Sequence, residues 1–181
     1  MKKLILLFSI LIGMSFFTYA QPPAEKTVVY IVRHGEKDVS DPKNSDPNLS
    51  ADGQERAKAL VKRLKKEKFA AVYSTKYKRT NQTGRLVAEK NNLTIISYNP
   101  SDPKALAELV KSKHKGQRVL IVGHSNTVLE LAEAFGVTRP LAALTDDDYD
   151  FLFKVEIDHG GYASLTTGNY GKRHHTSVIK K

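Results

Sequence analysis

Apolar runs and amphipathic segments alternate along this chain, and the alternation limits the possible folds more than any other feature of the sequence. Residues 27–32 and 118–123 are largely apolar runs rich in β-branched side chains, which is the pattern of strands buried on both faces. Shorter runs at 70–74 and 94–98 predict two further strands. Since strands that alternate with helices are joined by crossover connections, we expect the strands to lie parallel.

The segments between these runs have the spacing of amphipathic helices. Ser50 is predicted to cap the first helix, in which apolar residues recur every three or four positions. Residues 79–90, residues 103–113 and the apolar stripe that begins at Val128 predict three more helices. The sequence therefore predicts an α/β fold, a three-layer α/β/α sandwich around a mostly parallel sheet.

The last part of the chain departs from this alternation. Residues 149–157 and 162–167 are two strand-like runs, and the glycine-containing segment at 158–161 between them is a turn signal. We therefore expect a C-terminal hairpin at one side of the sheet. The basic tail from about residue 171 is expected to fray.

The N-terminal residues have the pattern of a secretory signal peptide. Two lysines precede an apolar run over 4–17, and Ala20 closes a cleavage site. The run is shorter than the roughly 20 residues of a membrane span, although an uncleaved N-terminal anchor is the alternative. Without cysteine the chain can carry neither a lipid-modified cysteine nor a disulfide. We expect residues 1–20 to be removed on export, leaving residues 21–181 as a single periplasmic or secreted domain without stable membrane association.

The formal net charge of +10 indicates attraction to anions, which include phosphate esters, nucleic acid and anionic membranes. No basic stripe interleaved with aromatic residues is present in the sequence, so nucleic acid is not an expected partner. Asp146-Asp147-Asp148 is interpreted as a solvated loop and His174-His175 as part of the tail, rather than as metal sites. The charge alone identifies no ligand.

Arginine and histidine residues follow three of the predicted strands. Arg33 and His34 end the first strand, and Arg79 follows the second. His124 ends the run at 118–123. Ligands bind outside the carboxyl ends of the strands in an open parallel sheet, so these four side chains are expected to meet there. Guanidinium groups match phosphate oxygens, and a neutral imidazole can attack phosphorus, so the pattern favours covalent phosphoryl transfer.

Four segments of the chain carry a resemblance to a known family. They are Val32–Glu36, Leu49–Ala57, Tyr73–Thr83 and Val119–Asn126. In this order they resemble the signature motif, the first helix start, the second-arginine segment and the second-histidine strand of the histidine phosphatase superfamily, which includes phosphoglycerate mutases and many phosphatases. The resemblance spans about residues 28–130.

The resemblance implies a phosphoglycerate mutase-like fold and a role for each matching residue. His34 would be the nucleophile that forms a transient phosphohistidine. Arg33, Arg79 and His124 would form the phosphate pocket around it, with Asn126 as a further phosphate contact. The resemblance implies a small phosphorylated substrate, and we expect no cofactor. The cluster lacks cysteines and a carboxylate-rich ligand set, so no metal is expected either.

The acid that protonates the leaving oxygen lies, in many relatives, on the loop after the third strand. In this chain the loop makes Asp102 the candidate, although Ser101 or Asp102 could instead cap the helix that opens at Pro103. Glu36 is a weaker candidate for the acid. Ser74 could contact phosphate or orient a neighbouring side chain.

The resemblance favours a phosphomonoester hydrolase, in which water takes up the phosphoryl group. A mutase is one alternative, but the short path from Arg79 to His124 leaves little length for a covering lid, and export would separate the protein from glycolytic substrates. A non-catalytic phosphate- or anion-binding module is the other alternative, because the motifs do not assign the acid. We expect specificity to depend on the loops at 37–48, 98–102 and 138–150.

Overall fold

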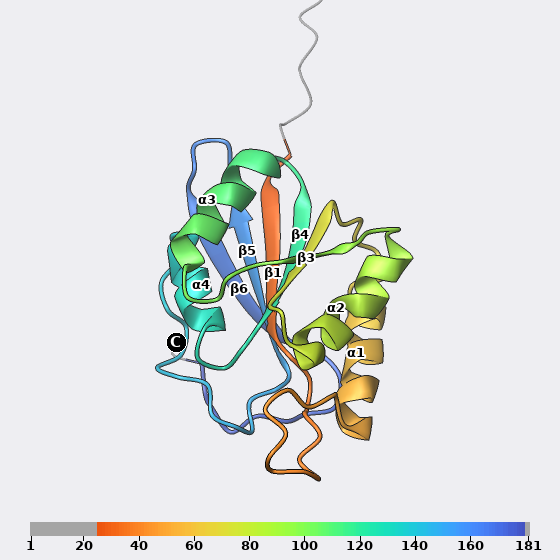
Figure 1. Cartoon of the computed structure of the whole chain (residues 1–181). Helices are drawn as coiled ribbons and strands as arrows, with labels where there is room; N and C mark the ends of the chain where they lie inside the picture. Colours follow the sequence, from red (N-terminus) through yellow and green to blue (C-terminus); the bar gives the residue numbers. More distant parts are fainter. Residues whose placement is uncertain (1–24, 180–181) are drawn as a thin grey trace, which may run out of the picture.

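Six strands form one sheet in the order β3-β2-β4-β1-β5-β6 (Figure 1). The computed structural model describes residues 25–179, so the expected signal peptide lies outside the described residues. The strands are β1 (Thr27–Arg33), β2 (Ala71–Ser74), β3 (Ile95–Ser97), β4 (Arg118–Gly123), β5 (Phe151–Ile157) and β6 (Ala163–Asn169). The helices are α1 (Ala51–Arg63), α2 (Lys78–Lys90), α3 (Pro103–Lys113) and α4 (Val128–Ala134). None of the helices within residues 25–179 is long and apolar enough to cross a bilayer.

The sheet is mixed, with a parallel part and a terminal hairpin. β1 pairs in parallel with β4, β4 with β2, and β2 with β3. β5 runs antiparallel to β1, and β6 runs antiparallel to β5. The predicted α/β fold, with a mostly parallel sheet and a C-terminal hairpin, is confirmed.

Helices cover both faces of the sheet, so the molecule has an apolar core on each side (Figure 1). Val29 and Ile31 of β1 belong to the core that α3 and α4 cover, whereas Tyr30 and Val32 belong to the core that α1 and α2 cover. Alternate residues of a strand point to opposite faces, which is why a continuous apolar run fits a strand covered on both sides. The three layers predicted from the alternation of the sequence are present.

The start of α1 packs directly on the segment that follows β1. Ser50 caps α1 as predicted, since its Oγ accepts a hydrogen bond from the backbone N–H of Gly53 at 3.2 Å. A Cβ on Gly53 would lie 2.2 Å from the carbonyl oxygen of Glu36, and one on Gly35 would lie 2.9 Å from that of Gly53. Only glycine permits this approach of two backbones, which holds the segment after His34 against the helix.

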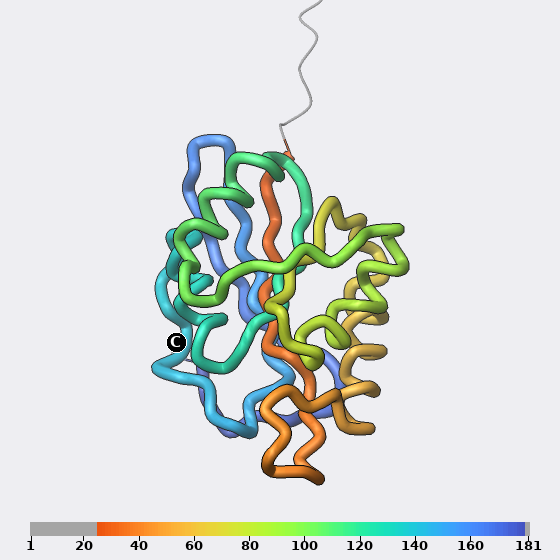
Figure 2. The backbone as a smooth tube through the Cα atoms, viewed as in Figure 1, coloured from red at the N-terminus to blue at the C-terminus, as the bar shows by residue number. Residues whose placement is uncertain are grey.

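The tail does not fray as predicted. The C-terminal segment runs along the carboxyl edge of the parallel strands, beside the loop that precedes β5 (Figure 2). The buried carboxylates of Asp148 and Asp150 accept hydrogen bonds from the backbone of Thr176 and His174, which lie 28 and 24 positions further along the chain. The interpretation of Asp146-Asp147-Asp148 as a solvated loop does not hold for Asp148, which is fully buried. The prediction of a frayed tail is wrong because this buried carboxylate binds the tail.

Candidate active site

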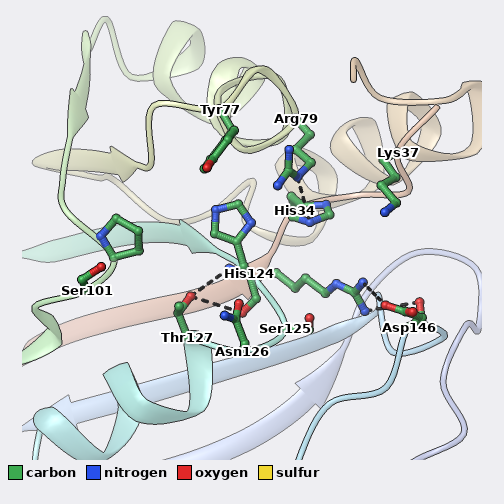
Figure 3. A pocket seen from close by; sticks show the side chains of 12 residues that line it. His34, Lys37, Tyr77, Arg79, Ser101, His124, Ser125, Asn126, Thr127 and Asp146 are labelled. Carbon is green, nitrogen blue, oxygen red and sulfur yellow. Dashed lines mark hydrogen bonds and ion pairs between the residues drawn. The ribbon is translucent and has the colours of Figure 1, made fainter. Parts of the chain in front are cut away.

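A cavity of about 500 Å³ opens at the carboxyl edge of the parallel strands (Figure 3). Its lining comes from the ends of β1 and β4, from the start of α2 and from three loops: Arg33, His34, Lys37, Tyr77, Arg79, Pro100, Ser101, His124, Ser125, Asn126, Thr127 and Asp146. The predicted site residues Arg33, His34, Arg79, His124 and Asn126 are all in this set, although they come from distant parts of the sequence. The three loops expected to affect specificity each contribute lining residues as well.

The imidazole of His34 is buried, and its hydrogen bonds define which nitrogen can react. Nδ1 lies 2.7 Å from the carbonyl oxygen of Gly35. Because a carbonyl oxygen can only accept, Nδ1 carries the proton and donates it to this bond. Nε2 therefore holds the lone pair, and Arg79 Nε donates a hydrogen bond to it at 3.2 Å (Figure 3). The structure thus presents Nε2 as the nucleophilic atom.

The guanidinium of Arg33 is held by the loop that precedes β5. Its Nη1 donates to the carbonyl oxygens of Thr145 at 2.6 Å, Asp148 at 3.2 Å and Asp146 at 3.3 Å. Its central carbon lies 3.9 Å from the centroid of the Tyr149 ring, which is a cation–π arrangement. Its Nε is buried and has no hydrogen-bond partner among residues 25–179. Buried donors without a partner are rare, and an oxyanion bound in this cavity could accept such a bond.

Arg79 and His124 complete the polar groups around the cavity. Arg79 lies in the first turn of α2, and its guanidinium stacks on Tyr77 at 4.5 Å from the ring centroid. His124 follows β4, and its Nε2 lies 3.0 Å from Thr75 Oγ1. The ring centroids of His124 and His34 are 5.3 Å apart. Two guanidinium groups and two imidazoles on one cavity form a set that suits a tetrahedral anion.

Both imidazoles are neutral at neutral pH. Burial is the largest cause that lowers the pKa of His34, to about 3; the Gly35 hydrogen bond opposes it less strongly, and the charges of Arg33 and Arg79 lower the pKa further. Burial and the same two arginines lower the pKa of His124 to about 4. A neutral His34 keeps the Nε2 lone pair available for attack on phosphorus.

The neutral histidines predict that the protein loses stability on acidification. The pKa of a histidine in an unfolded chain is about 6.5, whereas the pKa values of His34 and His124 in the folded protein are about 3 and about 4. Below the unfolded pKa the unfolded chain binds more protons than the folded protein. The free energy of unfolding should therefore fall by about 1.4 kcal/mol per pH unit for each histidine. Urea unfolding in phosphate-free buffer, between about pH 6.5 and the onset of carboxyl titration, measures this slope.

Two variants test which histidine produces the slope. In His34→Gln, the slope of the unfolding free energy against pH is expected to be smaller by the contribution of one histidine. His159→Gln is the matched control, because His159 is exposed in the turn between β5 and β6, and it should leave the slope unchanged. Equal slopes for the wild-type and His34→Gln proteins would contradict the lowered pKa of His34.

Asp102 is not among the residues that line the cavity. Its carboxylate accepts a hydrogen bond from the backbone N–H of Ala105 at 3.0 Å, and Pro103 follows it in the first turn of α3. Asp102 is therefore the N-cap of this helix, as the alternative interpretation of the sequence proposed. Its neighbour Ser101 lines the cavity instead.

Glu36 and Ser74 also lie outside the cavity lining. The Glu36 carboxylate accepts hydrogen bonds from Arg56 Nη2 and from His174 Nδ1, both at 2.7 Å. Burial raises the pKa of Glu36, but these hydrogen bonds outweigh burial and lower the pKa to about 2. A carboxyl group this acidic holds no proton to donate at neutral pH. The buried hydroxyl of Ser74 donates to the carbonyl oxygen of Thr75 at 2.9 Å.

Sequence reasoning missed the two tyrosines that stack on the arginines. Tyr149 and Tyr77 contact the guanidinium groups of Arg33 and Arg79. Tyr77 lies inside the Tyr73–Thr83 segment that resembles the family, but the resemblance assigns it no role. Tyr149 is far from Arg33 in the sequence, and no periodicity marks it. Within residues 25–179, no group of three or more His, Asp or Glu side chains is arranged to hold a metal ion.

The chain is similar to a known protein family and to several solved structures. The sequence model of the histidine phosphatase superfamily (branch 1) matches residues 29–99. No curated protein sequence matches the chain. Among solved structures, the protein histidine phosphatase SixA complexed with tungstate is similar, with 18% identity and a TM-score of 0.62 over 78% of this chain and 96% of that chain.

Two further solved structures are similar to the chain. A mycobacterial glucosyl-3-phosphoglycerate phosphatase has 15% identity and a TM-score of 0.64, over 81% of this chain and 100% of that chain. A phosphoglycerate mutase from Bacillus anthracis has 18% identity and a TM-score of 0.58, over 80% of this chain and 93% of that chain. At these identities the structural likeness establishes the fold, which is the phosphoglycerate mutase-like fold that the motifs predict.

Proposed function

We propose that this chain is a member of the histidine phosphatase superfamily and hydrolyses phosphomonoesters through a phosphohistidine on His34, a proposal that its partial family-model match and its fold support. The observation that carries the proposal is the state of His34. Its Nδ1 proton is bound to the carbonyl oxygen of Gly35, and its Nε2 lone pair accepts from Arg79 at 3.2 Å beside the cavity. A neutral imidazole next to two guanidinium groups suits attack on a bound phosphoryl group.

The geometry supports a reaction in two steps. In the first, His34 Nε2 forms a bond to phosphorus while the bond between phosphorus and the ester oxygen breaks, and that oxygen takes up a proton. Arg33 and Arg79 stabilise the charge on the three other phosphoryl oxygens. The Gly35 carbonyl stabilises the positive charge that develops on the imidazole. In the second step water attacks phosphorus, loses a proton, and displaces His34 to leave inorganic phosphate.

Asp146 is our candidate for the group that exchanges these protons. Among the residues that line the cavity, it is the one that carries a carboxyl group. One of its oxygens lies 3.6 Å from Arg33 Nη2 (Figure 3). A proton donor must lie within reach of the leaving oxygen, and Asp102, as the N-cap of α3, does not line the cavity.

Asp146→Asn is expected to slow the hydrolysis of an alkyl phosphate such as glycerol 2-phosphate by about 100-fold, the usual contribution of general acid catalysis. Hydrolysis of p-nitrophenyl phosphate should fall much less, since p-nitrophenolate leaves without a proton. The ratio of kcat/KM for the two substrates measures the effect. The control is Asp102→Asn, because asparagine caps a helix as well as aspartate does, and this variant should keep the wild-type ratio. An equal loss on both substrates would contradict the role of Asp146, and a changed ratio in Asp102→Asn would return the role to Asp102.

The cavity suits a small phosphorylated substrate. Its volume of about 500 Å³ is within the range of small-molecule sites. The solved structures similar to this chain include a glucosyl-3-phosphoglycerate phosphatase and a protein histidine phosphatase. A substrate panel should therefore contain sugar and glycerate phosphates together with a phosphohistidine-containing protein.

The proposal is tested by turnover of p-nitrophenyl phosphate in the presence of a chelator, combined with acid-labile phosphoenzyme trapping. We expect turnover that the chelator does not affect, and a phosphoenzyme that decays in acid as phosphohistidine does. A protein that shows neither turnover nor a phosphoenzyme at any acidic or neutral pH would contradict the proposal.

A non-catalytic anion-binding module is the second candidate function. It is favoured by the position of Asp102, which caps α3 and leaves the cavity without the expected acid. Binding of vanadate or phosphate without hydrolysis of any ester would select this candidate. A mutase, by contrast, would transfer the phosphoryl group from the trapped phosphoenzyme to an acceptor alcohol in preference to water.

A further inference from the structure

The C-terminal segment, residues 174–177, is bound to the loop that holds Arg33. The Asp148 carboxylate is fully buried and accepts hydrogen bonds from Thr176 N at 2.9 Å, Ser177 N at 3.0 Å and Ser177 Oγ at 2.6 Å. From the other side the same carboxylate accepts from Thr145 N at 2.6 Å and Thr145 Oγ1 at 2.9 Å. One carboxylate therefore ties the C-terminal segment to the start of the 145–148 loop.

The residues after Asp148 make matching contacts with the segment. The backbone N–H of Tyr149 donates to the carbonyl oxygen of His174 at 2.9 Å. The buried Asp150 carboxylate accepts from His174 N at 3.1 Å and from His175 Nδ1 at 2.8 Å. Three consecutive residues of the chain are thus held by the C-terminal segment.

These same residues determine where the Arg33 guanidinium lies. Its Nη1 donates to the carbonyl oxygens of Thr145, Asp146 and Asp148, and its plane lies over the Tyr149 ring. Each of these four contacts depends on the conformation of a loop without regular secondary structure. Hydrogen bonds to the Asp148 carboxylate fix that conformation. Thr145 donates them from within the loop, and Thr176 and Ser177 donate them from the C-terminal segment.

We propose that Asp148 and the C-terminal segment 174–177 are positioning residues for Arg33, which act by holding the 145–149 loop in the conformation that aims the guanidinium at the bound phosphoryl group. The proposal rests on the proposed function, because it assigns Arg33 to oxyanion binding. None of these residues touches the substrate, since the cavity lining includes neither Asp148 nor the segment.

The charge of Asp148 suits this role. Burial alone would raise its pKa, but hydrogen bonds from Ser177, Thr145 and Thr176 outweigh burial and hold the pKa well below its usual range. The group is therefore an anion that accepts five hydrogen bonds. An asparagine at this position has an N–H₂ group in place of one oxygen, so it would face donors with donors. The loop would then lose the contacts that place Arg33, and an error of about 1 Å in a binding group costs about 100-fold in rate.

The test compares Asp148→Asn with Asp147→Asn, which removes the same charge from the neighbouring exposed residue. Orthovanadate is the probe of the oxyanion site, and its dissociation constant is measured together with kcat and KM for p-nitrophenyl phosphate. We expect Asp148→Asn to weaken vanadate binding at least about 10-fold and to lower kcat/KM by about 10- to 100-fold. Asp147→Asn should stay within about twofold of the wild type. Wild-type vanadate affinity in Asp148→Asn would overturn the proposal.

A coupling measurement separates positioning from a general loss of stability. In an Arg33→Ala background, Asp148→Asn should change vanadate affinity by less than about twofold, because the group that it positions is absent. Equal losses in the presence and absence of Arg33 would overturn the positioning role. If Asp148→Asn does not fold, Ser177→Ala serves in its place, since it removes only the hydroxyl that donates at 2.6 Å. It is expected to show a smaller loss with the same dependence on Arg33.

The wild-type protein in the same experiment distinguishes a failure of the positioning role from a failure of the proposed function. If the wild-type protein hydrolyses p-nitrophenyl phosphate and binds vanadate, and Asp148→Asn does so equally well, the positioning role alone is rejected. A wild-type protein with neither turnover nor vanadate binding would reject the proposed function, and the positioning role with it.

Discussion

His34→Ala is expected to lower kcat/KM for p-nitrophenyl phosphate by at least about 10⁴-fold, because the loss of a covalent nucleophile removes the first chemical step. The same variant should form no trapped phosphoenzyme, since the proposed function makes His34 Nε2 the atom that bonds to phosphorus. Steady-state kinetics and phosphoenzyme trapping after a single turnover measure the two effects.

His159→Ala is the matched control for this variant. It removes an exposed imidazole from the turn between β5 and β6, so it should keep both the wild-type rate and the phosphoenzyme. A phosphoenzyme that persists in His34→Ala would show that another group carries the phosphoryl group. The first candidate would then be His124, whose ring lies 5.3 Å from that of His34.

Arg79→Ala is expected to lower kcat by about 10²- to 10³-fold, the usual effect of removing a preorganised donor from a transition state. Two losses combine in this variant. The hydrogen bond from Nε to His34 Nε2 disappears, so the imidazole keeps only its hydrogen bond to the Gly35 carbonyl oxygen. The cavity also loses one of its two guanidinium groups, which the proposed function assigns to the phosphoryl oxygens. Saturation kinetics with p-nitrophenyl phosphate separate the effect on kcat from that on KM.

Two further variants serve as controls for the loss in Arg79→Ala. Arg85→Ala removes an exposed arginine from the same helix, where it pairs with Glu89 at 2.9 Å, and should leave kcat unchanged because such surface pairs contribute little. Arg79→Lys keeps the charge but not the planar fork, so its kcat should lie between those of the wild type and Arg79→Ala. A loss confined to KM in Arg79→Ala would mean that this arginine binds the ground state and the transition state equally.

The centre of the candidate site could be predicted because sequence motif and sheet topology coincide there. Arg33, His34 and His124 lie at or directly after the ends of buried strands, and apolar runs of this kind are easily recognised. Parallel pairing then brings these strand ends to one edge of the sheet. Arg79 could be placed because its segment resembles a family motif. The same reasoning applies to the fold, since β1 and β4 at the centre of the sheet are largely continuous apolar runs.

The supporting contacts could not be predicted, because they join irregular segments that are far apart in the sequence. The loop at 145–149 has no periodic pattern, yet it supplies the carbonyl oxygens and the ring that hold Arg33. The C-terminal segment reads as a basic tail, and its order depends on two carboxylates buried elsewhere in the fold. Asp102 shows a different difficulty, because one aspartate before a proline fits both a helix cap and a loop acid. Export stays a prediction, since residues 1–24 are outside the described part of the chain.

The pairing of β1 has a consequence for how this protein folds. β1 is central in the sheet, yet its hydrogen-bonded neighbours are β4 and β5, whose registers join Val28 to Arg118 and to Glu156. The strand that bears Arg33 and His34 therefore has no partner until most of the chain has been synthesised. Contacts between such distant segments slow folding, and an unpaired apolar strand can meanwhile associate with other chains. We expect refolding yields to rise as protein concentration falls, and the sheet edge that carries the candidate site to be among the last parts of the molecule to form.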